Sequence, residues 1–248
     1  MAQVIEQDFF GGAIRGVVPQ DWIDGSDLRE IPDHQELFLS PDTLSNFIIE
    51  INQRVSQEDA LSTFTTFSHQ HPSLTATSGT AASATRETID QAAALHHLND
   101  LCDEGDAIQI VDPPTRVNPT RLGASAPPGS SVIAYKGVVQ FLTTSRRRGG
   151  RVHAPTNGTT APVTDAAVGG AALDGTAGGL PISKVTCHYL MVRLEAQETD
   201  LLVFFNVPHE EFDKSGDARG LSREEAVAED AVGALVDRLE IWDWGLFV

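Results

Sequence analysis

The stretch Thr199-Asp200-Leu201-Leu202-Val203-Phe204-Phe205-Asn206-Val207 decides the fold class of this chain. Residues 201–205 are apolar at every position, so a strand built from them has two apolar faces. Such a strand needs cover on both sides, and we therefore expect it in the middle of a sheet with a layer packed on each face. Val132 to Leu142 and Ser183 to Leu194 are rich in β-branched and aromatic residues, which predicts further long strands.

Shorter segments bring the predicted number of strands to about seven. They are Gly12 to Val18, Gln35 to Leu39, Phe47 to Asn52 and Ala107 to Val111. Helices are expected from about Ser56 to His69, over Ser83 to Leu101, and near the end of the chain. The last helix has apolar residues on one stripe, and Ser222-Arg223-Glu224-Glu225 matches a capping box at its start. This order of elements predicts an α+β domain with a mostly antiparallel sheet of six or seven strands and helices on both faces.

Two segments interrupt this pattern. Residues 143–182 contain 25 Gly, Ala, Thr or Pro in 40 positions and no aromatic residue, so they cannot bury enough apolar area to offset their conformational entropy. We expect one domain over residues 1–248 that carries a disordered insertion at 143–182. Asp112 to Ser131 contains five prolines and predicts a surface connection.

Charge and composition narrow the classes of function. The 248 residues include 17 Lys and Arg against 35 Asp and Glu, a formal net charge of −18, so direct binding to nucleic acid is not expected. No apolar run approaches the ~20 residues of a membrane-spanning helix, and Met1 to Phe10 lacks the layout of a signal peptide. The two cysteines, Cys102 and Cys187, are expected to be reduced. We expect a monomer that works in the cytosol or the nucleus, with no membrane partner.

Motifs for catalysis or cofactor binding are missing from the sequence. Neither a Rossmann nor a P-loop glycine motif is present, and His69-Gln70-His71 lacks further residues at zinc-ligand spacing. Cys187 lies in a predicted strand, where the side chain of His188 should leave the opposite face, so the two cannot be read as a nucleophile and its base. We therefore predict no catalytic residue, metal site or cofactor. Trp242 and Trp244 are interpreted as aromatic residues that seal the core.

The negative charge is concentrated near the start of the chain. The first 60 residues hold 12 acidic and 3 basic side chains, a balance of −9, which is half of the total. From Asp21 to Phe38, carboxylates alternate with apolar residues, so the apolar members can anchor the segment while the acids project outward. One interpretation is a soluble turn capped by Asp24 or Ser26, and the other is a preshaped anionic surface for a basic partner.

The same region carries a family resemblance. Phe10-Gly11-Gly12-Ala13-Ile14, Pro19 and the run from Asp24 to Phe38 resemble the opening signature of the Mog-type Ran guanine nucleotide release factors. Later segments are similar to that family as well: Arg193-Leu194, Thr199 to Val203, Asn206-Val207-Pro208 and Asp243 to Phe247. The resemblance implies a non-catalytic α/β/α sandwich, similar in fold to the extrinsic P subunit of photosystem II. It also implies the GTPase Ran as partner and a role in nuclear protein import, with no cofactor of the protein's own.

The candidate contacts with Ran follow from the acidic segment and the resemblance together. We expect Asp24, Asp27, Asp33, Glu36 and Glu50 to contact Ran, with Arg29 and Gln35 orienting them. A carboxylate could compensate the positive potential of a GTPase phosphate site after the phosphate leaves. Two other functions stay open: a small-molecule-binding or hydrolytic domain with scattered pocket residues, and an adaptor that acts through the insertion at 143–182.

Overall fold

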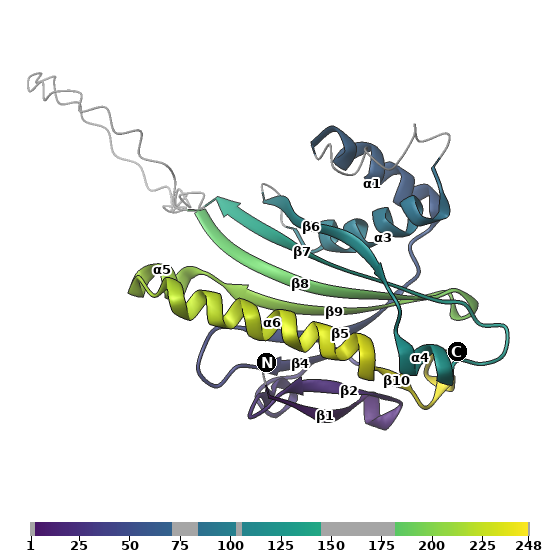
Figure 1. The fold of residues 1–248 in the computed structure, drawn as a ribbon, viewed down its shortest axis with the longest axis horizontal. Helices are drawn as coiled ribbons and strands as arrows, with labels where there is room; N and C mark the ends of the chain where they lie inside the picture. The colour runs from purple at the N-terminus through teal and green to yellow at the C-terminus, as the bar shows by residue number, and fades with distance from the viewer. Residues whose placement is uncertain (1–2, 71–83, 103–105, 145–181, 248) are drawn as a thin grey trace, which may run out of the picture.

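The computed structural model describes residues 3–70, 84–102, 106–144 and 182–247. Seven strands form one antiparallel sheet in the order β3-β4-β5-β9-β8-β7-β6 (Figure 1). Their bounds are β3 Ile23–Asp24, β4 Gln35–Leu39, β5 Asn46–Gln53, β6 Ala107–Val117, β7 Val132–Thr144, β8 Ile182–Leu194 and β9 Thr199–Pro208. The predicted fold class, α+β with a mostly antiparallel sheet of six or seven strands, is thereby confirmed.

The central strand of this sheet is β9, as the sequence predicts. It is fourth of seven, and every residue from Thr199 to Phe205 is buried. Alternate residues of β9 belong to two hydrophobic cores. Val203 lies in the first core, on one face of the sheet, and Phe204 lies in the second core, on the other face. The neighbouring strand β8 divides in the same way, with Leu190 in the first core and Cys187 in the second. The two-faced apolar strand therefore joins two separate cores.

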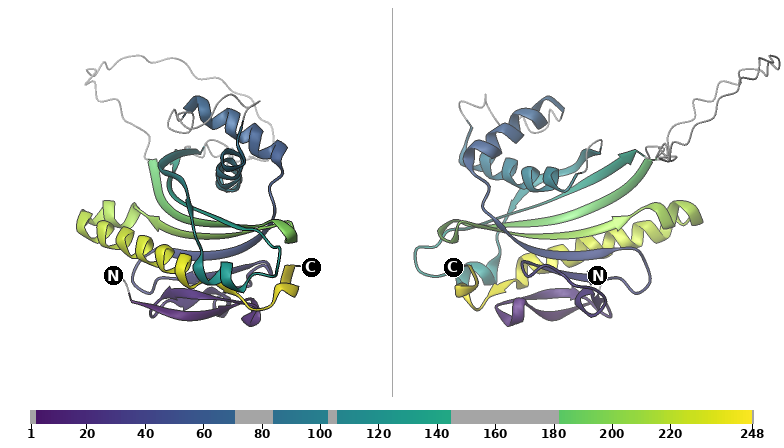
Figure 2. Two further views of the ribbon diagram at one scale, coloured as in Figure 1. Left: turned by 45° about the vertical axis from the view of Figure 1, so that its right-hand side comes forward. Right: turned by 180° about the vertical axis from the view of Figure 1, so that it is seen from behind.

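Helices cover both faces of the large sheet (Figure 2). On one face lie α1 Gln57–Gln70 and α3 Arg86–Asp100, which bury Phe64, Phe67, Leu95 and Leu98 with the sheet. The other face is covered by α6 Ala218–Arg238, with the short helices α4 Thr120–Ser125 and α5 Glu210–Ser215 beside it. Within the described residues, no helix has the length and apolar character needed to cross a bilayer.

A second, smaller sheet lies on the α6 side and was not predicted as a separate sheet. It pairs β1 Val4–Phe9, β2 Ile14–Pro19 and β10 Glu240–Ile241 in the order β1-β2-β10. The strand predicted at Gly12 to Val18 is β2, which begins two residues later because residues 10–12 form a turn with positive φ angles. Phe9, Ile14 and Val17 bury this sheet against the first core.

Two local predictions were wrong. Asp112 to Ser131 is not only a surface connection, because β6 continues to Val117 across two register shifts and α4 places Leu122 in the core. An edge strand with bulges tolerates prolines that a central strand would not. The last helix begins at Ala218 rather than at Ser222, because the Asp217 carboxylate accepts a hydrogen bond from Gly220 N at 2.8 Å. The Ser222 hydroxyl donates instead to Ala218 O within the helix.

The predicted insertion lies almost wholly outside the described residues. Its first two positions belong to the end of β7, and its last position, Ile182, begins β8. These strands pair from Thr144 with Ile182 onward. The prediction of disorder for the rest of residues 143–182 concerns positions that the structure does not describe.

A buried ionic cluster fastens α3 to the sheet. The Arg193 guanidinium, which is 2% exposed, donates to Asp90 at 2.7 Å, to Asp200 at 3.0 Å and to the Val55 carbonyl at 2.7 Å. Nε2 of His97 lies 3.0 Å from the other oxygen of Asp200. Since Arg193 is held by groups from α3, β9 and the connection that leads into α1, the cluster fixes the α1–α3 layer on β8 and β9.

Candidate functional site

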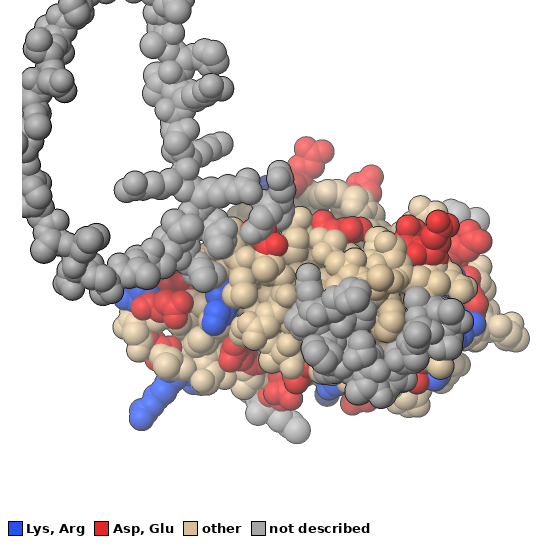
Figure 3. Space-filling view, turned by 90° about the horizontal axis from the view of Figure 1, so that it is seen from above, with Lys and Arg blue, Asp and Glu red and all other residues tan. Residues whose placement is uncertain are grey.

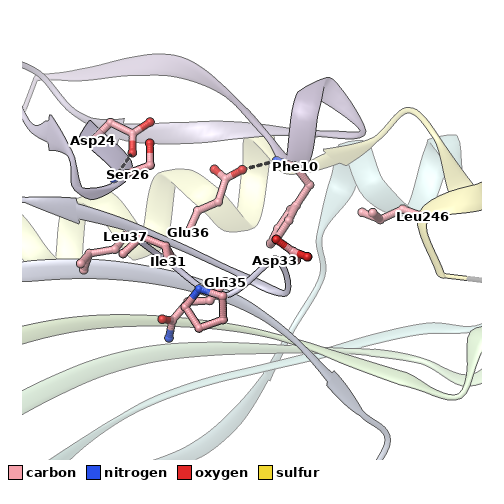
Figure 4. A pocket seen from close by; sticks show the side chains of 10 residues that line it. Phe10, Asp24, Ser26, Ile31, Asp33, Gln35, Glu36, Leu37 and Leu246 are labelled. Carbon is pink, nitrogen blue, oxygen red and sulfur yellow. Dashed lines mark hydrogen bonds between the residues drawn. The ribbon is translucent and has the colours of Figure 1, made fainter. Parts of the chain in front are cut away.

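The acidic segment forms one wall of a pocket of about 350 Å³ at the β3–β4 edge of the large sheet. Four of the seven predicted site residues line it: Asp24, Asp33, Gln35 and Glu36. Figure 4 shows them together with Phe10 and Leu246, which come from near the two ends of the chain. The structure therefore gathers residues from the acidic segment Asp21 to Phe38 and from near both ends of the chain at one place.

Glu36 is the most constrained acid of this pocket. It lies on β4 opposite Ile49 and is half-buried, and its carboxylate accepts a hydrogen bond from the backbone N–H of Phe10 (Figure 4). Phe10 has a positive φ of 51°, and Gly11 and Gly12 follow with 65° and 92°. An aromatic residue rarely adopts such a backbone, so the bond to Glu36 helps to hold the turn in place.

Burial raises the pKa of Glu36, the bond from Phe10 opposes that rise, and the negative charge of Asp24 adds to it. A carboxylate in this situation is stabilised by a cation brought into the pocket, because the cation relieves both the desolvation and the repulsion. The electrostatics therefore favour a positively charged group as the occupant.

Asp24 fixes the conformation of the turn that follows it in the sequence. Its side chain accepts from Ser26 N at 2.8 Å and so caps the short 3-10 helix Gly25–Asp27. The interpretation of Asp24 as a cap is confirmed. Gly25 at the start of this turn packs directly on Leu37, and a Cβ there would lie 2.9 Å from the Leu37 side chain. The acidic turn is thus seated on the sheet rather than free.

The other three predicted residues do not line the pocket. Asp27, at the end of the 3-10 helix, and Arg29, on the loop after it, are exposed, and Arg29 has no ion pair among the described residues. Glu50 accepts hydrogen bonds from Gln35 at 3.3 Å and from Asn52 at 3.0 Å. Gln35 therefore does orient one carboxylate, but Glu50 lies on β5 beside the pocket rather than in its wall.

The apolar part of the site was not selected from the sequence. Ile31, Leu37 and Leu246 line the pocket together with the carboxylates, and Leu28 is 64% exposed on the adjoining loop. The signal for Leu246 was present, because the closing segment Asp243 to Phe247 is part of the family resemblance. Nothing in the sequence indicated that the Phe10 backbone would bond to Glu36, since 26 residues separate them.

Charge alone does not single out this pocket. Figure 3 shows acidic side chains spread over several parts of the face seen from above, where α1 and α3 lie. What distinguishes the pocket is that its carboxylates converge around a fixed backbone, next to exposed apolar side chains.

Other chemical candidates take structural roles. Cys187 is fully buried, and burial raises the pKa of its thiol well above the usual range. Among the described residues there is no group of three or more His, Cys, Asp or Glu side chains arranged to hold a metal ion. The interpretation of Trp242 as a core residue is wrong: it is 54% exposed, and the Arg15 guanidinium stacks 3.8 Å from its ring. Trp244 is half-buried against the first core, as predicted.

Comparison with known proteins places these features in a family. A family model described as "Ran-interacting Mog1 protein" matches residues 7–208. The human "Ran guanine nucleotide release factor" is 48% identical over 42 residues, which cover 17% of this chain and 23% of that protein. The zebrafish (Danio rerio) protein of the same description is 42% identical over 53 residues, or 21% and 29% of the two chains. These matches therefore span less than a third of either relative.

Solved structures agree in fold over the whole length. The Saccharomyces cerevisiae Ran-binding protein Mog1p aligns with a TM-score of 0.54 and 18% identity, covering all of both chains. A solved structure of a point mutant of protein Mog1 aligns with a TM-score of 0.54 and 17% identity over 99% of this chain and 100% of that one. With the family match extending over most of its length, this chain belongs to the Mog1 family.

Proposed function

We propose that this protein binds the GTPase Ran and promotes the release of its guanine nucleotide, with the β3–β4 pocket as the contact surface. The observation that carries the proposal is the convergence of Asp24, Asp33 and Glu36 on one pocket in a chain of the Mog1 family. The curated relatives named above are described as Ran release factors, which supports the same partner here.

The mechanism requires a difference in affinity between two states of Ran. A release factor must bind the nucleotide-free or loosened GTPase more tightly than the loaded one, because a ligand shifts an equilibrium only by its differential affinity. The phosphate site of a GTPase is built from a lysine and backbone amides, and it is left with excess positive potential when the phosphate leaves. The free oxygen of Glu36 and the carboxylate of Asp33 supply the complementary charge.

Apolar side chains give this contact a second component. Leu28 is exposed between the acidic residues Asp27 and Glu30. Covering an exposed leucine in a complex removes its apolar surface from water, which favours association. We propose Leu28 as an apolar anchor, and Asp27 and Arg29 as rim residues that affect mainly the association rate.

A nucleotide-release assay tests the proposal. Ran loaded with a fluorescent guanine nucleotide is mixed with the protein, and release is followed for the wild type, for Asp33→Asn combined with Glu36→Gln, and for Asp237→Asn as control. Asp237 is exposed on α6 and does not line the pocket. We expect the double variant to lose most of the stimulation while the control keeps it. Equal release by all three proteins would remove the carboxylate mechanism, and absence of any complex with Ran would remove the partner.

The same proposal includes a non-catalytic role in regulating nuclear protein import and a location in the nucleus and also the cytoplasm. Imaging of the tagged wild-type protein and of the tagged double variant tests the location. Exclusion of the wild-type protein from the nucleus would contradict it.

A further inference from the structure

A second pocket, of about 310 Å³, lies near the opposite edge of the large sheet, between β6, β7, β8 and α6. It shares no residue with the β3–β4 pocket, and strands β5 and β9 separate the two. The volume is at the lower end of the range of small-molecule sites. Nothing in the Ran contact proposed above uses this pocket.

A buried histidine whose Nε2 has no hydrogen-bond partner lines the second pocket. His188 is 9% exposed, and its Nε2 is buried and makes no hydrogen bond in the described structure. Two residues earlier on the same face of β8, Thr186 is fully engaged, with His209 at 2.7 Å, Glu225 at 3.1 Å and Gln140 at 3.2 Å. Since buried polar atoms normally have partners, the unpaired ring nitrogen at a pocket wall indicates a place for a ligand.

The edge strand β6, which β7 separates from β8, is bulged in the part of the sheet that lines this pocket. The sheet pairs Asp112 of β6 with Val138 of β7, and Val138 with His188 of β8, so the three lie in one row. The register of β6 shifts on both sides of Asp112. Gly137 of β7 permits the close approach of the β6 backbone, because a Cβ at this position would lie 2.8 Å from the Asp112 carbonyl oxygen. Bulges of this kind redirect side chains and are frequent at binding sites.

Charged groups of both signs surround the unpaired nitrogen. Asp112 and Lys136 come from the sheet, and Glu229 comes from α6, one helical turn after Glu225. Within the described residues, the side chains of Asp112, Lys136 and Glu229 form no hydrogen bond or ion pair, whereas Glu225 is already bonded to Thr186. The pocket thus offers two free carboxylates, one free ammonium group and one neutral-histidine nitrogen.

From this arrangement we infer that the second pocket binds a small zwitterion of the amino-acid class. Its ammonium or guanidinium group would donate to the carboxylates of Asp112 and Glu229 and to the ring of His188, and its carboxylate would pair with Lys136. Burial lowers the pKa of His188, which favours the neutral ring, while Glu225, Glu229 and Asp112 oppose that shift and Lys136 adds to it. A neutral ring can accept a hydrogen bond from a cation, and a protonated ring cannot.

Calorimetric titration of the full chain with L-arginine tests the inference, with agmatine, which lacks the carboxylate, as the matched probe. We expect L-arginine to bind at millimolar concentration or below and more tightly than agmatine. Glu229→Gln, at an exposed position, should weaken arginine binding about tenfold, as for loss of a hydrogen bond to a charged group, while Asp237→Asn should not. Lys136→Met should abolish the preference for arginine over agmatine.

A ring-nitrogen NMR signal provides the second readout. Saturation with arginine should shift the ¹⁵N resonance of His188 Nε2 in the wild type. The inference is overturned by absence of binding, by equal affinity for arginine and agmatine in the wild type, or by unchanged affinity in Glu229→Gln. Ran-nucleotide release by Glu229→Gln should equal that of the wild type, so a failure of this inference and a failure of the Ran proposal are distinguishable.

Discussion

Replacing Glu36 with glutamine separates the charge of the β3–β4 pocket from its shape. The glutamine Oε1 can still accept the hydrogen bond from Phe10 N–H, so the turn at residues 10–12 keeps its support. Only the negative charge is removed. A hydrogen bond to a charged group contributes about 1.5–3 kcal/mol, so we expect the affinity for nucleotide-free Ran to fall roughly 10- to 150-fold.

The same substitution should not destabilise the fold. Because the pKa of Glu36 is raised in the folded state, folding favours its protonated form. Its contribution to the free energy of unfolding is therefore fully present below the unfolded pKa and is lost as the pH rises through the higher folded pKa. Glutamine imitates the protonated form at every pH. We expect Glu36→Gln to match the wild type at about pH 3 and to be the more stable protein at about pH 7.

Two measurements on one preparation test this prediction. Urea unfolding at the two pH values gives the stability difference, and surface-immobilised nucleotide-free Ran gives the affinity. The reasoning is refuted if Glu36→Gln binds Ran as tightly as the wild type, or if it is less stable at neutral pH. The second result would show that the charge of Glu36, and not only its bond to Phe10, holds the turn.

Three further substitutions have defined outcomes. Arg193→Met leaves Asp90 buried without its partner and should lower the free energy of unfolding by about 3–5 kcal/mol, measured by urea denaturation. Gly137→Ala should cost about 1–3 kcal/mol in the same experiment, because the new Cβ would clash with the Tyr189 hydroxyl and lie 2.8 Å from the Asp112 carbonyl oxygen; a neutral result would contradict the close packing. Leu28→Ser should change stability by less than about 0.5 kcal/mol and weaken Ran binding more than about fivefold in the immobilised assay, and unchanged binding would contradict its role as an anchor.

The sequence was sufficient to predict six of the seven strands of the large sheet, but not that β2 belongs to a separate small sheet. Leu201 to Phe205 are apolar at every position, so their central place followed from burial alone. In β1, by contrast, polar and acidic residues occupy half of Val4–Phe9, and only Phe9 is fully buried. β3 and β10 have two residues each, too few to show any periodicity. The partner of β10 is β2, near the other end of the chain, and a local pattern cannot reveal that pairing.

At two places, contacts that the local sequence motif does not include decide the structure. The capping-box pattern at Ser222 is real as a sequence pattern, but Asp217 caps the helix a turn earlier, and the chain continues helical through Ser222. Trp242 follows β10 directly and was expected in the core. The backbone of Trp242 is fixed by a hydrogen bond to Ala13 O at 2.8 Å, and this leaves its ring outside, over Arg15.

The candidate site was predictable in its position but not in its geometry. The acidic segment was visible in the composition, and four of the seven selected residues line one pocket. Glu50 was selected because of its charge, although its place on β5 sets it beside the pocket rather than within it. The bond between Glu36 and Phe10 and the place of Leu246 depend on contacts between segments far apart in the sequence. The sequence does not reveal the second pocket, because His188 reads there only as a neighbour of Cys187, although Lys184, Thr186 and His188 are polar residues on a strand face that continues with Leu190, Val192 and Leu194.

Hydrogen exchange of the protein in complex with nucleotide-free Ran tests the central claim most directly. We predict slower exchange in residues 23–39 and 244–247 on complex formation, with no change in β6 and β7 at the far edge of the sheet. Protection of α1 and α3 instead, with residues 23–39 unaffected, would show that Ran binds the opposite face and that the acidic pocket is not the contact surface.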